Sequence, residues 1–194
     1  MNSGHFLRRG LRLEYMTLGW NVVGTVIVIN AAVVARSVAL AGFGLDSLIE
    51  IVASVVVIWQ LTNAGYDREK VALRVIGIAF LALGLYVLVQ SAATLISHSH
   101  PNPSPVGIAW LLATVVVMLW LSFAKRRTGR ELNNPVLVTE AKVTLVDGYL
   151  AAAVLAGLVL NAIAGWWWAD PIAGLVIVYY GIVEGAHALQ ESRA

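Results

Sequence analysis

The chain has 194 residues, of which 59% are hydrophobic and only 12% are charged. Soluble domains of this size carry about 25% charged residues, so the composition excludes an ordinary water-soluble domain and a disordered chain. The net charge of +2 is too small to indicate a nucleic-acid-binding protein, and a chain without cysteine has no disulfide framework. We therefore expect an all-α membrane protein.

Six apolar stretches are long enough to cross a bilayer, whose hydrocarbon core of about 30 Å needs about 20 helical residues. They are residues 15–35, 37–61, 71–97, 105–124, 136–165 and 171–189. We expect one transmembrane domain over residues 1–194, with six helices and no soluble domain. The first stretch is too long for a cleaved signal peptide and lacks a small-residue cleavage pattern, so we expect it to stay in the protein.

Arginine and lysine gather before the first stretch and in every second connection. They are Arg8, Arg9, Arg12, Arg68, Lys70, Arg74, Lys125, Arg126, Arg127 and Arg130. Because short cytoplasmic loops are enriched in these residues, both termini are predicted to be cytoplasmic and the protein to lie in the inner (cytoplasmic) membrane. The second stretch is predicted to span although it carries Asp46 and Glu50. The basic residues before the first stretch and those after the second can both be cytoplasmic only if the chain crosses the membrane an even number of times between them.

Five acidic residues lie inside the predicted spans: Asp46, Glu50, Glu140, Asp147 and Glu184. Each costs about 2.5 to 3.5 kcal/mol at the bilayer centre unless it is paired, protonated or hydrated. Lys142 is the one basic residue that the pattern places among them, and its long side chain can reach the inner interface. The carboxylates therefore need another counter-charge, and a divalent cation or protons are the candidates.

Helical spacing places several of these acids close in depth. Asp46 and Glu50 are four residues apart, so they share one helix face, about 6 Å apart along the axis. Asp147 lies about 16 Å from the inner end of the antiparallel fifth span and also reaches the midplane. Glu140, two turns before Asp147, lies nearer the cytoplasm, and Asn21 of the first span could add an amide oxygen. If the second and fifth spans are neighbours, these groups form a site that exchanges a cation for protons.

Structural interpretations stay open for the weaker members of this set. Glu140 and Glu184 could be protonated packing residues or could bond to neighbouring helices, and so could Asn21. His98 and His100 in an outer loop could collect cations, or they could belong to an ordinary polar loop. The Gly181 and Gly185 stripe in the sixth span indicates close helix packing, not chemistry.

The stretch SVALAGFGLDSLIEIVAS in the second span, and VDGYLAAAV followed by GWWWADPIAGLVIV into the sixth, resemble the transmembrane domain of the cation diffusion facilitator family. The resemblance implies a proton-coupled exporter of Zn²⁺ or another divalent metal, usually homodimeric, with two ligands on the second span and two on the fifth. By position, three of these ligands fall on Asp46, Glu50 and Asp147. The remaining position falls on Val143, which cannot coordinate a metal, so Glu140 or a water molecule would have to replace it. We further expect the chain to belong to the short branch of the family, without the C-terminal cytoplasmic domain of typical members.

We therefore predict a transporter, not an enzyme, that exports a divalent cation by alternating access in exchange for protons. The resemblance favours Zn²⁺, whereas a carboxylate site without His or Cys also suits Mn²⁺ or Fe²⁺. No cofactor is expected beside the transported ion, and the expected partners are that ion, protons, the lipid bilayer and a second copy of the chain.

Two alternatives remain. A proton-coupled exporter of small organic cations would need an aromatic-lined cavity around the acids. A non-transporting partner or scaffold subunit would keep its cellular function when the acids are replaced by amides.

Overall fold

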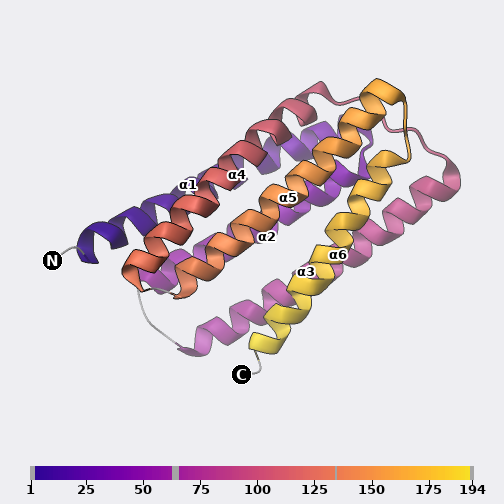
Figure 1. Ribbon diagram of the computed structural model, residues 1–194. Helices are drawn as coiled ribbons and strands as arrows, with labels where there is room; N and C mark the ends of the chain where they lie inside the picture. Colours follow the sequence, from indigo (N-terminus) through magenta and orange to yellow (C-terminus); the bar gives the residue numbers. More distant parts are fainter. Residues whose placement is uncertain (1–2, 63–65, 134, 193–194) are drawn as a thin grey trace.

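Six helices run along a common bundle axis in the computed structural model, which describes residues 3–62, 66–133 and 135–192 (Figure 1). They are α1 (Ser3–Ala35), α2 (Val38–Thr62), α3 (Tyr66–Ser97), α4 (Pro105–Leu132), α5 (Pro135–Ala164) and α6 (Ala169–Glu191). The predicted all-α architecture is confirmed.

Two helices extend well beyond the apolar stretches that predicted them. The helix α1 begins at Ser3 instead of residue 15, and α4 continues to Leu132 instead of ending at 124. Charged residues can continue a helix beyond the hydrocarbon layer, and Arg127 and Glu131 form an ion pair four residues apart on α4, at 3.7 Å. The prediction that Lys125 lies in a loop is therefore wrong, since this residue lies inside α4.

In the part of the chain that the structure describes, five helices contain a stretch that is long and apolar enough to cross a membrane. Within the described residues these stretches are Phe6–Ala35, Gly77–Ser97, Pro105–Leu132, Glu140–Ala164 and Ala169–Glu191. The helix α2 is not among them, and several of its side chains lie outside those that the structure describes. It nevertheless packs against α1, α3, α5 and α6, so it belongs to the bundle interior. The chain is an integral membrane protein, and the helix that carries Asp46 and Glu50 is covered by its neighbours.

Both termini lie at the same end of the bundle (Figure 1). Arg8, Arg9 and Arg12 lie near the start of α1, and the basic residues that close α4 lie at that same end. The side chains of Arg68 and Lys70 lie outside those that the structure describes. The basic residues thus gather as the prediction of cytoplasmic termini requires, and we refer to this end as the inner end and to the opposite one as the outer end.

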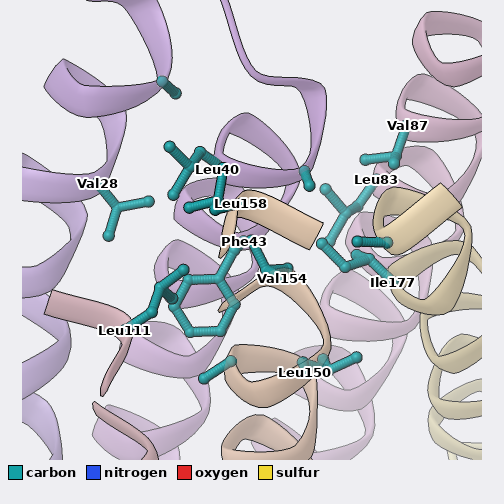
Figure 2. Close-up of a cluster of buried hydrophobic side chains, with 14 of the residues drawn as sticks. Val28, Leu40, Phe43, Leu83, Val87, Leu111, Leu150, Val154, Leu158 and Ile177 are labelled. Atoms are coloured by element: carbon teal, nitrogen blue, oxygen red, sulfur yellow. The ribbon is translucent and has the colours of Figure 1, made fainter. Parts of the chain in front are cut away.

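The main hydrophobic cluster contains side chains from all six helices, with Phe43 of α2 among its fully buried members (Figure 2). It also includes Leu150 of α5 and Ile177 of α6. Phe43, Leu150 and Ile177 each lie nearer the outer end than Asp46, Asp147 and Glu184 of the same helices do. Packed apolar side chains therefore lie between these three acidic residues and the outer end of the bundle.

The helices α3 and α6 approach each other closely through glycine. A Cβ atom added to Gly185 would lie 3.0 Å from the carbonyl oxygen of Gly77, and one added to Gly77 would lie 3.0 Å from the carbonyl oxygen of Gly185. Such contacts let two backbones touch and are typical of helix pairs in membranes. The predicted packing role of the small residues in α6 is confirmed at this pair.

Asp170 joins the first turns of α2 and α6. Its carboxylate accepts hydrogen bonds from the Ser37 hydroxyl and from the backbone N–H groups of Val38, at 3.0 Å, and Ala39, at 3.4 Å. The Ser37 hydroxyl accepts a further bond from the N–H of Leu40. A carboxylate at a helix N-terminus satisfies N–H groups that have no partner inside the helix and interacts favourably with the helix dipole. The WADPIAG junction therefore fixes the start of α6 against the start of α2.

Candidate functional site

Four acidic side chains line one pocket inside the bundle. Asp46 and Glu50 come from α2, Asp147 from α5 and Glu184 from α6. The other lining residues are Phe80, Val143, Val146, Leu150, Tyr180 and Gly181. The pocket has about 10 Å³ of free volume, close to what one water molecule needs. It therefore offers carboxylate oxygens around a space for a single small species, within a largely apolar wall.

Three of these carboxylates are almost completely buried. Asp46 and Asp147 are each 2% exposed, and Glu50 is 3% exposed. Both carboxylate oxygens of Asp147, and Oδ2 of Asp46, have no hydrogen-bond partner in the described part of the chain. Burying an ionised carboxylate without a partner costs several kcal/mol, so these groups require protons or a cation to be tolerated.

The four carboxylates are close enough for their charges to interact. The charges of Asp147 and Glu184 act on Asp46. Glu50 in turn is acted on by Asp46, Asp147 and, from just outside the pocket, Glu140. However, no three His, Asp or Glu residues within the described ranges have their donor atoms arranged as a finished metal-coordination shell. Binding one ion therefore requires these side chains to move toward one another.

A buried ion-pair network lies beside the pocket, toward the inner end of the bundle. Lys125 of α4 is 0% exposed, and its ammonium lies 3.1 Å from Oε2 of Glu14 on α1 and 3.3 Å from Oε1 of Glu140 on α5. It also donates to the hydroxyl of Thr144 at 3.1 Å. An ammonium has three N–H donors, and these three contacts use all of them. Lys125 therefore has no donor left for the pocket carboxylates.

The structure places the predicted site residues in different surroundings. Asp46, Glu50 and Asp147 line the same pocket, and Val143 lines it without offering a donor atom. Glu140 contacts Lys125 and does not line the pocket.

Asn21 on α1 is not a lining residue either. It is 3% exposed, and its Nδ2 atom has no hydrogen-bond partner among the described residues. Two of the five candidates thus lie away from the pocket that the other three share.

Sequence reasoning missed the Lys125 network. Lys142, which was expected to be the basic residue among the intramembrane acids, is exposed, whereas Lys125 is completely buried. Lys125 stands next to two arginines and so resembles a loop residue. A helical signal was nevertheless present, because Met118, Leu121 and Lys125 are three and four residues apart and continue the buried face of α4.

The two loop histidines lie against a tryptophan at the outer end. The rings of His98 and His100 have centroids 5.4 Å and 5.2 Å from that of Trp167. Trp166 and Trp168 stack on each other at 5.1 Å. These two histidines and three tryptophans thus form an aromatic cluster around the loop that precedes α6.

Comparison with known proteins gives a family match over most of the chain. Residues 16–194 match the model of the cation efflux transmembrane domain. The chain is similar to transmembrane protein 163 of Xenopus laevis, with 21% identity over 92% of this chain and 66% of the relative. It is 27% identical to metal tolerance protein 10 of Arabidopsis thaliana, over 89% of this chain and 42% of that protein. It is 28% identical to the cation-efflux pump FieF of Shewanella oneidensis, over 70% of this chain and 48% of the pump. The chain thus spans between 42% and 66% of the length of these relatives.

Proposed function

The chain belongs to the cation efflux family, as its resemblance to the cation diffusion facilitators indicated, and we propose that it exports a divalent metal cation in exchange for protons. The proposed ligands are the carboxylates of Asp46, Glu50 and Asp147. Zn²⁺ is the first candidate because of the family, and Mn²⁺ and Fe²⁺ also suit carboxylate oxygens. We further propose that the protein works as a homodimer in the inner membrane.

The observation that carries this proposal is the set of unpartnered oxygens in the pocket. Asp147 is buried, and neither of its oxygens has a hydrogen-bond partner among the described residues. The ammonium of Lys125 is buried nearby, but its three N–H groups already donate to Glu14, Glu140 and Thr144. A divalent cation or protons would supply the missing positive charge. A cation–proton exchanger must bind these two species in turn.

The surroundings of the pocket are consistent with alternating access. Apolar side chains such as Phe43 and Ile177 close the route to the outer end, whereas charged side chains lie toward the inner end. Export requires the pocket to open first to one side and then to the other. Protons that enter from the outer side would lower the negative charge of the carboxylates and release the metal, because metal ligands must be deprotonated.

The pocket is less suitable for the organic cations of the first alternative. Two aromatic residues, Phe80 and Tyr180, do line it, as that alternative requires. However, a free volume of about 10 Å³ accommodates one water-sized species and no organic cation in this conformation. Metal export is therefore the function that the geometry supports best.

Calorimetric titration of the purified protein with Zn²⁺ and with Mn²⁺ tests the site. We expect one of these metals to bind the wild type and the Asp46→Ala variant to lose most of that binding. Glu191→Gln is the matched control, because it also removes one carboxylate but at an exposed position at the end of α6. Equal binding by wild type and Asp46→Ala would remove Asp46 from the site.

A growth assay in a host without its own metal exporters tests the function in cells. We expect the wild type to restore tolerance to the transported metal and Asp147→Asn to abolish it. Tolerance that survives Asp147→Asn would contradict the proposal and favour a scaffold role. Protection against organic cations instead of metals would favour the alternative transporter.

A further inference from the structure

We propose that Glu184 of α6 supplies the fourth carboxylate of the divalent-cation site, in place of the residue that α5 lacks at Val143. This inference rests on the proposed function, since it completes the same site. It extends the ligand set from two helices, α2 and α5, to three.

The position of Glu184 follows from the junction at the outer end. Asp170 fixes the start of α6 to Ser37 at the start of α2, and both helices run from there toward the inner end. Glu50 lies thirteen residues after Ser37, and Glu184 lies fourteen residues after Asp170. At 1.5 Å per residue these carboxylates lie about 20 Å and about 21 Å from the junction. The Asp170 contact therefore sets the two glutamates at nearly the same depth.

The contacts of the pocket bring Glu184 to the other acids laterally as well. The helix α6 packs against both α2 and α5, and Glu184 is one of the lining residues that α6 contributes. It is close enough to Asp46 of α2, which lines the same pocket, for the two charges to interact. Glu184 is thus placed beside the proposed ligands both along the membrane normal and across the bundle.

The pocket itself indicates a ligand independently of how many acids surround it. Asp147 is 2% exposed and both of its oxygens lack a hydrogen-bond partner among the described residues, as does Oδ2 of Asp46. These unsatisfied acceptors border a space of about 10 Å³. Val143 also borders this space but has only methyl groups to offer, whereas Glu184 lines the pocket with a fourth carboxylate.

Four carboxylates define the class of cation that the site would take. The donor set contains oxygen atoms only, with no imidazole and no thiolate. Such sets suit hard divalent ions such as Mn²⁺ or Mg²⁺, whereas zinc sites usually include nitrogen or sulfur ligands. With Glu184 as a ligand, we expect the site to accept Mn²⁺ as well as Zn²⁺.

Titration of purified Glu184→Gln with Mn²⁺ and Zn²⁺, beside the wild type, tests the role of this residue. We expect the affinity for Mn²⁺ to fall about tenfold or more, because loss of one carboxylate removes both a donor and a negative charge. Glu191→Gln, also on α6 but exposed, should bind as the wild type does. Wild-type affinity in Glu184→Gln would overturn the inference.

A second variant separates loss of a ligand from loss of structure. Val143→Asp combined with Glu184→Gln returns a carboxylate to the same pocket from α5, and we expect it to bind Mn²⁺ more tightly than Glu184→Gln alone. No recovery in a double variant that elutes as the wild type does in gel filtration would overturn the role of Glu184.

Asp147→Asn distinguishes this inference from the proposed function. If Asp147→Asn loses binding while Glu184→Gln keeps it, the site stands and only the contribution of α6 fails. If both variants bind as the wild type does, the proposed site itself fails.

Discussion

Replacing Lys125 by methionine removes the ammonium that three side chains share while it keeps a long apolar side chain. Oε2 of Glu14 and Oε1 of Glu140 then lose their positive partner, although the two side chains are only 0% and 5% exposed. Breaking a buried ion pair by removing one partner costs about 3–5 kcal/mol, because the other charge stays buried without compensation. We expect the free energy of unfolding to fall by about this amount.

Denaturant unfolding in detergent, followed by tryptophan fluorescence, measures this cost. Lys142→Met is the matched control, because Lys142 is exposed on α5, and its effect should stay within about 0.5 kcal/mol. The triple variant Glu14→Gln, Lys125→Met, Glu140→Gln removes all three charges and should recover most of the loss. If Lys125→Met is as stable as Lys142→Met, or if the triple variant is no more stable than Lys125→Met, the network does not have the role described.

Three further predictions follow from other contacts. Asp170→Ala should lower the free energy of unfolding by about 2–3 kcal/mol, because it leaves N–H groups of α2 without their charged acceptor. A stability equal to that of the wild type would show that the contact between Asp170 and α2 is dispensable. Gly185→Ala should destabilise the bundle by about 1–3 kcal/mol, because its Cβ would crowd α3. Gly19→Ala, whose Cβ meets nothing within 4 Å, should be neutral or slightly stabilising. Equal effects of the two variants in thermal unfolding would contradict the close approach of α3 and α6. Metal binding should release protons and weaken as the pH falls, because protons compete for the same carboxylate oxygens. Calorimetry in buffers of different ionisation enthalpy measures the number of protons released. Binding that does not depend on pH would exclude proton exchange at these groups.

The sequence predicted those features that depend on distances along a single helix. Bilayer thickness fixes the length of an apolar stretch, so six helices could be counted from hydropathy alone. A spacing of four residues likewise predicted that Asp46 and Glu50 share a face, and both line the pocket. Asp147, which the rise per residue predicted to lie at a similar depth, lines that pocket too.

Features that depend on which helices are neighbours could not be predicted in this way. Lys125 pairs with Glu14, which lies 111 residues away, and with Glu140, which lies 15 residues away. Hydropathy and charge rules treat a lysine beside two arginines as a loop residue, because they do not register partners on other helices. The place of Glu184 likewise depends on the contact between Asp170 and the start of α2, which brings α6 to the pocket.

Metal flux into proteoliposomes under an imposed pH gradient tests most directly whether the buried carboxylates carry a cation in exchange for protons. The wild type should carry Zn²⁺ or Mn²⁺ into the liposomes while protons leave them, and the rate should fall when the pH gradient is abolished. Asp147→Asn should show no flux above that of protein-free liposomes, whereas Glu191→Gln should transport as the wild type does. Flux in Asp147→Asn equal to that of the wild type would contradict the proposed site.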